Sequence, residues 1–242
     1  MADLILAPYF TKDISYHQHD SSNKGRGGSK PDDYTQMKIW YESIVKYDLP
    51  ACIFHNELTD DFINKYTTKK ISFHRWEKQH RPSYNDERFY AYLEYLTTHT
   101  EVERAICTDL YDVEFYGNVF DWMDKNEQYD LFFGEERMGR FSSKWMVEKC
   151  RRIKLPLISN KYAPGCYIYN AGIVGGKRKP LMKLLTRMIA KFEKINPKEN
   201  ANMPVFNYCA DQTKGYKIFS GFPLHNVFNS NVVIPGTYIK HK

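Results

Sequence analysis

The feature that most constrains the fold is a regular alternation of short apolar runs and helical segments in the first half of the chain. Four apolar runs have the length of buried strands: residues 3–8, 51–54, 70–73 and 104–108. Two segments between them carry apolar side chains at helical spacing, one starting at Asp32 and one covering residues 85–98. Strands that alternate with helices are typical of a parallel sheet covered by helices, so the pattern predicts an α/β fold.

The second half of the chain continues with strands and helices and contains no long linker or internal repeat. Four segments read as strands: residues 129–134, 167–176, 216–219 and 231–235. Residues 142–153 predict a helix capped by Ser142 or Ser143, and a longer amphipathic helix follows Pro180. We therefore expect a single α/β domain spanning residues 1–242.

Composition excludes several other classes of protein. Apolar residues make up 42% of the chain and charged residues 26%, which is typical of a globular protein rather than a disordered one. No apolar run reaches the roughly 18 residues that span a bilayer, and Asp3 in the first apolar stretch argues against a secretory signal. The five cysteines form no CxxC motif, so a reducing compartment is expected, without a disulfide framework or structural zinc. Together with the missing signal and span, this leads us to expect a cytoplasmic location.

The charge of the chain bears on its partners. Lysine and arginine number 35 against 29 acids, which leaves a formal net charge of +6 and suits an anionic ligand. Nucleic-acid binding calls for a dense basic stripe, whereas the charge is interpreted here as spread along the chain. No nucleic-acid partner is predicted.

The most informative segment is the one that follows the strand at residues 104–108. The strand delivers Asp109 at its carboxyl end, where ligands bind in open α/β sheets, and Asp112 follows three residues later. Two carboxylates are hard oxygen ligands suited to Mg²⁺ or Mn²⁺. They can converge only if the chain turns after Asp109, because positions i and i+3 of a strand face opposite sides. A solvated acidic turn is the alternative interpretation.

Three weaker motifs follow along the chain. Asn170 and Gly172 combine an amide with backbone that a ligand can approach closely, although a plain strand-to-helix joint would look the same. Asp211 and Gln212 place a carboxylate beside an amide after a short apolar stretch. His225 follows a Phe-Ser-Gly turn and can be a ligand, a base or a surface residue.

Taken together and in this order, these motifs resemble a known family. The set consists of Thr-Asp-x-x-Asp-Val, Asn-Ala-Gly-Ile-Val-Gly-Gly, Asp-Gln and Phe-Ser-Gly-x-Pro. It resembles the nucleotide-sugar glycosyltransferases of GT-A fold, of the small glycogenin and lipopolysaccharide-galactosyltransferase type, and is similar to glycosyltransferases of large DNA viruses. The resemblance implies a single GT-A-like domain with a mixed, mostly parallel central sheet flanked by helices. Its nucleotide-binding half would cover about residues 1–115, and its donor-sugar and acceptor half about 116–242.

The resemblance also implies a metal site. Asp109 and Asp112 would stand where that fold keeps its Asp-x-Asp pair, touching the ribose of the donor and a Mn²⁺ or Mg²⁺ ion on its diphosphate. The spacing here is Asp-x-x-Asp, so either carboxylate can be the metal ligand. The galactosyltransferase type has a histidine where this chain has Ile218, and His225 would substitute for it in the metal shell.

The remaining site residues are implied in the same way. Arg88 would contact the donor, and Asn170 and Gly172 would line the pocket of the donor sugar. Asp211 and Gln212 would lie next to the anomeric carbon and act in catalysis. At the end of the first strand, three residues would border the base: Ala7, Pro8 and Tyr9.

The function expected from this resemblance is that of a metal-dependent glycosyltransferase. It would move a sugar from a nucleoside-diphosphate donor, a UDP-sugar by resemblance, to a glycan, glycoprotein or lipid-linked acceptor. A sugar nucleotidyltransferase and a catalytically inactive nucleotide-sugar or carbohydrate-binding module are the alternatives. If the chain is viral, its location would be the cytoplasm of the host cell.

Overall fold

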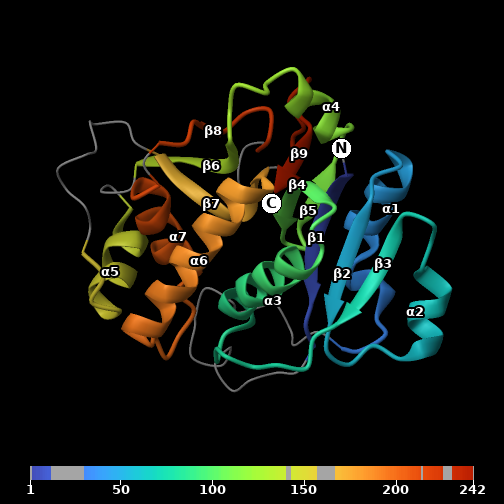
Figure 1. Cartoon of the computed structure of the whole chain (residues 1–242), viewed down its shortest axis with the longest axis horizontal. Coiled ribbons are helices and arrows are strands. Elements are labelled where there is room, and N and C mark those ends of the chain that lie inside the picture. The colour runs from blue at the N-terminus through green and yellow to red at the C-terminus, as the bar shows by residue number, and fades with distance from the viewer. Residues whose placement is uncertain are drawn as a thin grey trace.

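A seven-stranded sheet forms the centre of the computed structural model, which describes residues 2–11, 30–139, 143–156, 167–213, 215–225 and 231–241 (Figure 1). The order of the strands from one edge to the other is β3 (Ile71–Arg75), β2 (Ala51–His55), β1 (Ala2–Tyr9), β4 (Val102–Thr108), β7 (Tyr167–Lys177), β6 (Leu131–Gly139) and β8 (Ile218–Ser220).

The pairing of these strands makes the sheet mixed. β1 runs parallel to both β2 and β4, and β3 runs parallel to β2, so the carboxyl ends of these strands meet at one edge. β7 is antiparallel to β4 and to β6, while β8 is parallel to β6. The predicted α/β domain with a mixed central sheet is therefore confirmed, and the architecture is consistent with a GT-A-like fold.

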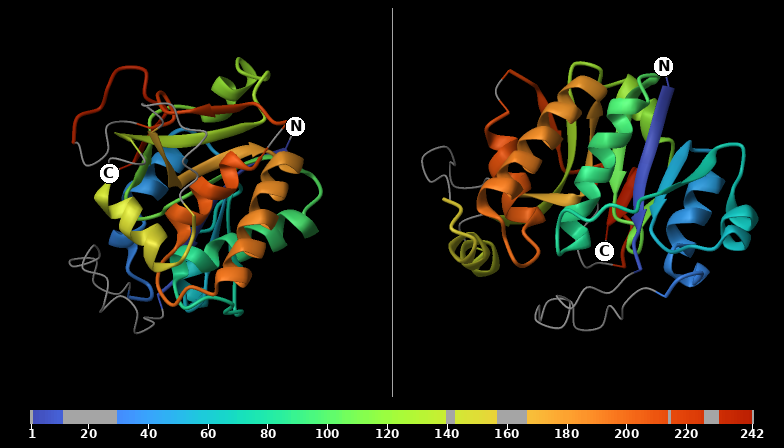
Figure 2. Two further views of the ribbon diagram at one scale, coloured as in Figure 1. Left: turned by 90° about the vertical axis from the view of Figure 1, so that its left-hand side faces the viewer. Right: turned by 60° about the horizontal axis from the view of Figure 1, so that its bottom comes forward.

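Helices cover both faces of the sheet (Figure 2). Alternating residues of β1 face the two sides, because Ile5 and Ala7 belong to one apolar core and Leu6 belongs to the other. The first core includes side chains from α1 (Lys38–Lys46), α2 (Asp60–Tyr66) and α4 (Val119–Asp124). The second includes side chains from α3 (Tyr84–Thr98), α6 (Arg178–Ile195) and α7 (Asn202–Asp211). A smaller cluster joins α5 (Lys144–Arg152) to β7.

A second, two-stranded sheet was not predicted. β5 (Val113–Phe115), directly after the Asp109–Asp112 segment, pairs antiparallel with β9 (Ile239–His241). This pairing places the last described residues of the chain beside the carboxyl end of β4.

Two of the sequence predictions need correction. The helix expected from Asp32 begins only at Lys38, after the 3-10 turn η2 (Tyr34–Gln36), because Asp32 has a left-handed backbone (φ 60°). Residues 231–235 form no strand in the structure. The cap of α5 is confirmed as Ser143, whose hydroxyl accepts a hydrogen bond from the amide of Met146.

Two general properties agree with the composition. No helix among the described residues is both long and apolar enough to cross a bilayer. Four cysteines in the described part of the chain are free and buried: Cys52, Cys107, Cys150 and Cys209.

The loop between β3 and α3 is organised by one buried carboxylate, that of Glu87. Its Oε1 accepts a hydrogen bond from the indole N–H of Trp76 (2.9 Å), and its Oε2 accepts from the backbone amides of His80 and Arg81 (both 2.7 Å). The side chain of Glu87 is completely buried. An acceptor-only group therefore fixes a loop that carries no regular structure of its own.

We expect Glu87→Gln to lower the free energy of unfolding by about 2–4 kcal/mol, because an amide turns N–H donors toward the N–H donors of the loop. The matched control is Glu94→Gln on the same helix, whose partner Lys78 is at the surface, with a change below about 0.5 kcal/mol. Urea denaturation of both variants measures the difference. Equal losses in the two variants would contradict the role given to Glu87.

Candidate functional site

The site begins where β4 ends and the chain bends. The backbone N–H of Asp109 donates to the carbonyl of Gly172 in β7 (3.0 Å), and the indole of Trp40 donates to the Thr108 hydroxyl (2.9 Å). Residues 110–112 form a bend before β5 starts. Because the chain turns here, Asp109 and Asp112 can point to the same side despite their spacing, as the sequence required.

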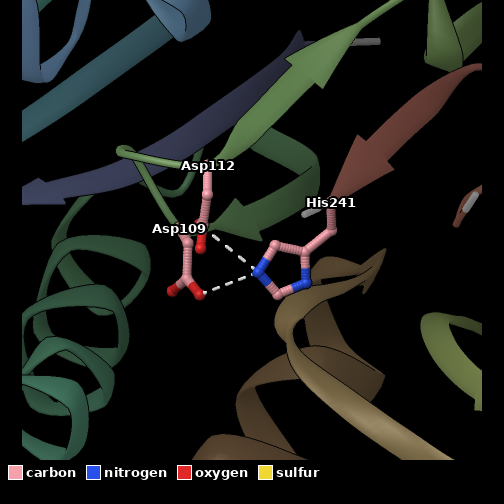
Figure 3. A group of neighbouring side chains, drawn as sticks. All are labelled: Asp109, Asp112 and His241. Atoms are coloured by element: carbon pink, nitrogen blue, oxygen red, sulfur yellow. Dashed lines mark ion pairs between the residues drawn. The ribbon is translucent and has the colours of Figure 1, made fainter. Parts of the chain in front are cut away.

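The carboxylates of Asp109 and Asp112 converge on the imidazole of His241 (Figure 3). Nε2 of His241 lies 3.3 Å from Oδ2 of Asp109 and 3.3 Å from Oδ1 of Asp112. One ligand atom from each residue lies within 4.8 Å of the others. His241 reaches this position because it pairs with Val113 in the two-stranded sheet. We refer to these three residues as the Asp-Asp-His group.

Gly172 leaves the space in which the Asp-Asp-His group fits. A Cβ atom at this position would lie 2.7 Å from Oδ2 of Asp109 and 2.6 Å from Cε1 of His241. Both distances are shorter than a carbon can approach without displacing its neighbour. Glycine is therefore required here by contact with the group, while the expected role of Gly172 in a donor-sugar pocket stays a prediction.

Arg88 supplies a buried positive charge on the other side of Asp109. Its guanidinium forms an ion pair with Oδ1 of Asp109 and donates to the carbonyl of Ala171 (2.9 Å). The side chain is 2% exposed, and its burial lowers the pKa of the guanidinium from the usual value. The ion pair leaves Oδ2 of Asp109 directed at His241.

Asn170 connects the group to a further carboxylate, that of Glu136 on β6. The Asn170 amide donates to Oε1 of Glu136 (2.9 Å), and its carbonyl accepts from the backbone N–H of Gly172 (2.7 Å). Burial raises the pKa of Glu136, while Asn170 and the nearby His241 oppose this shift. The site thus contains a third carboxylate, which is hydrogen-bonded to an amide, whereas the two aspartates face the imidazole of His241.

The structure does not bring Asp211 and Gln212 to this group. They lie at the C-terminal end of α7, where the carbonyl of Gln212 accepts a hydrogen bond from Arg187. It is the first turn of α7 that reaches the site, because the sulfur of Met203 accepts from the backbone N–H of Ala171 (3.1 Å). The ten residues of α7 extend over roughly 15 Å, so the two ends of the helix contact different parts of the protein.

His225 lies beside the group but not in it. Its ring centre is 5.6 Å from that of His241, nearly edge-on, and a Cβ on Gly134 would lie 2.9 Å from its Nδ1. Burial and the neighbouring His241 lower the pKa of His225 to about 3. The position expected of His225 among the metal-binding residues is occupied by His241.

Ala7, Pro8 and Tyr9 are buried at the carboxyl end of β1. The hydroxyl of Tyr9 donates to the carbonyl of Asp33 (2.8 Å), and its ring centre lies 6.2 Å from that of Tyr111 in the bend after β4. These residues therefore lie at the same end of the sheet as the Asp-Asp-His group.

Two residues of this site had not been predicted, His241 and Glu136. His241 belongs to a three-residue strand that is too short to show a periodic pattern, so no signal in the sequence indicates it. Glu136 lies inside β6, after its apolar residues, whereas Asp109 directly follows the end of β4. Neither residue can be assigned without knowing which strands are neighbours.

The donor set is suited to a divalent cation. Two carboxylates and one imidazole are common ligands of first-row transition metals, and three protein ligands leave coordination positions for water or substrate. The Asp-Asp-His group is mostly buried, with exposed side-chain fractions of 19%, 12% and 6% for Asp109, Asp112 and His241. The Asp-Asp-His group could therefore hold a metal ion.

Comparison with protein-family models and with curated proteins finds no match for this chain.

We expect Gly172→Ala to weaken Mn²⁺ binding by about tenfold or more, because the added methyl group displaces Asp109 or His241. Titration calorimetry with Mn²⁺ measures the affinity, and thermal unfolding verifies the fold. Gly215→Ala is the control, since it strains a left-handed turn (φ 86°) but has nothing within 4 Å of the added carbon. Unchanged Mn²⁺ affinity in Gly172→Ala would refute the metal site.

Proposed function

We propose that the protein is a metal-dependent glycosyltransferase that uses a nucleoside-diphosphate sugar as donor. The observation that carries the proposal is the Asp-Asp-His group, located directly after β4 at the carboxyl edge of an α/β sheet. Ligands of such sheets bind at this edge. The ordered motifs in the sequence add the class of ligand, because they resemble those of nucleotide-sugar enzymes.

The donor set favours Mn²⁺ over Mg²⁺ as the ion. Mg²⁺ prefers an octahedral shell of oxygens and keeps several waters, whereas imidazole is a good ligand for transition metals. When bound, such an ion stabilises the negative charge that develops on the nucleoside diphosphate as the sugar–phosphate bond breaks. Asp109, Asp112 and His241 would hold it there.

Arg88 would act on the same charge from within the protein. Its ion pair with Oδ1 of Asp109 fixes one oxygen of that carboxylate, so only Oδ2 remains directed at the group. Because the guanidinium is buried, its electrostatic effect on a neighbouring diphosphate is screened little by water. Arg88 would therefore position Asp109 and contribute positive potential at the donor site.

Glu136 is the residue that would handle the proton of the acceptor. It is the carboxylate on β6 that Asn170 holds beside the group, and burial raises its pKa toward the range in which a base works efficiently at neutral pH. Glu136, rather than Asp211, would then be the catalytic base.

The first test is titration with UDP, GDP and their sugars, with and without Mn²⁺. We expect metal-dependent binding of one nucleotide, weakened about tenfold or more in Asp112→Asn, because that change removes one ligand of the metal. Asp61→Asn, an exposed aspartate in the first turn of α2, is the charge-matched control and should bind like the wild type.

Each other result has a definite meaning. A folded protein that binds Mn²⁺ but no nucleotide or nucleotide sugar would refute the glycosyltransferase proposal and retain the metal site. Metal-dependent nucleotide binding without transfer or slow hydrolysis of any donor would instead indicate a binding module.

A second prediction concerns Glu136→Gln. We expect donor hydrolysis or transfer to fall by roughly 10²–10⁴-fold, because the amide cannot accept the proton of the attacking hydroxyl. The affinities for Mn²⁺ and for the nucleotide should stay close to those of the wild type. Release of the nucleoside diphosphate measures turnover, and wild-type turnover in this variant would exclude Glu136 as the base.

A further inference from the structure

One helix of the protein, α6, carries a large excess of positive charge. α6 contains six cations and one acid, a net charge of +5, whereas the whole chain carries +6. An excess of one sign on a single helix creates a local potential that the total charge of the protein does not reveal.

Most of these cations share the outer side of the helix. Five of them are spaced three or four residues apart and form what we call the basic face: Lys179, Lys183, Arg187, Lys191 and Lys194. The opposite side of α6 carries Leu184, Leu185 and Phe192, which are buried in the core. Arg178 does not belong to the face, because its guanidinium donates to the carbonyl of Leu96.

The acid of α6 does little to neutralise this face. The carboxylate of Glu193 accepts a hydrogen bond from the hydroxyl of Tyr90 on α3. It is therefore directed along the α3 side of the helix. The basic face keeps its excess of positive charge.

A groove continues the basic face toward α7, which lies beside α6 at the surface (Figure 2). Its volume is about 380 Å³, and its lining includes Arg187, Lys191 and Lys194 from α6 and Tyr208 from α7. The guanidinium of Arg187 is held by the carbonyl of Gln212 (2.6 Å). The groove can thus accept an anionic group of the size of a phosphorylated headgroup among three cations.

We propose that the basic face of α6 and this groove dock the protein on a lipid surface rich in anionic headgroups. This inference is independent of the proposed enzymatic function. Four of the five cations are lysines, whose ammonium groups act as point charges toward headgroups without demanding a fixed geometry. A straight row of such charges on a convex helix matches a flat anionic surface.

The same features argue against a nucleic acid as partner. Single-stranded nucleic acids need aromatic faces on which bases stack. The two rings near the face are covered, because Lys191 lies 4.2 Å above Tyr208 and Lys183 lies 5.2 Å above Tyr216. Arginine, the residue best suited to bidentate phosphate contacts, occurs once in the row.

The test is flotation of the full chain with vesicles of phosphatidylcholine alone or with added phosphatidylserine. We expect binding only to the anionic vesicles, decreasing as salt rises. The triple variant Lys183→Gln, Lys191→Gln, Lys194→Gln should bind roughly 100-fold more weakly, since each cation contributes about fivefold.

The matched control removes the same charge from the opposite side of the sheet. Lys38→Gln, Lys46→Gln and Lys65→Gln, on exposed positions of α1 and α2, should leave vesicle binding close to that of the wild type. Thermal unfolding confirms that both triple variants are folded.

Three results would overturn the proposal. The first is absence of the wild type from anionic vesicles at low salt. The second is an equal loss of binding in the two triple variants, which would indicate that total charge rather than a docking face drives binding. Salt-sensitive binding of a single-stranded RNA oligonucleotide with no vesicle binding would assign the basic face to nucleic acid instead.

Discussion

The buried ion pair between Arg88 and Asp109 links the fold of this protein to its candidate site. A guanidinium that is 2% exposed requires a partner, because an unpaired charge in the core strongly destabilises a protein. Asp109 and the carbonyl of Ala171 meet this requirement and thereby join α3, β4 and β7. The same pairing fixes which oxygen of Asp109 remains for a metal. Stability of the core and geometry of the site thus depend on one carboxylate.

The rest of the site depends on the close approach of the β7 backbone to the Asp-Asp-His group, which is possible because Gly172 has no side chain. Gly172 has no Cβ, so β7 can lie against both Asp109 and His241 while its carbonyl accepts from the Asp109 amide. His241 arrives through the pairing of β9 with β5. The pairing of β5 with β9, which are far apart in sequence, therefore completes the Asp-Asp-His group at the end of β4.

The sequence predicted those parts of the fold and site that local patterns encode. The end of a strand singled out Asp109 and Asp112, and an amide beside flexible glycine backbone singled out Asn170 and Gly172. His241 was missed because a three-residue strand has no detectable periodicity and its partner is remote in sequence. The helix α7 was not predicted, so the sequence could not indicate that Asp211 and Gln212 lie at its C-terminal end. The short elements α2 and β5 were missed because, like β9, they are too short to show a clear periodic pattern.

The two sides of α6 show how one helix can serve two separate tasks. Its apolar side packs in the core that also contains residues of α3 and β7, so it supports the elements that hold Arg88 and Gly172. Of the outer cations, Arg187 donates to the Gln212 carbonyl and two lysines lie over tyrosine rings, but none is buried in the core. Glutamine has nearly the same helix propensity as lysine, so the helix itself does not require this many charges. Its concentration of +5 on 18 residues is explained better by an external anionic surface than by the needs of folding.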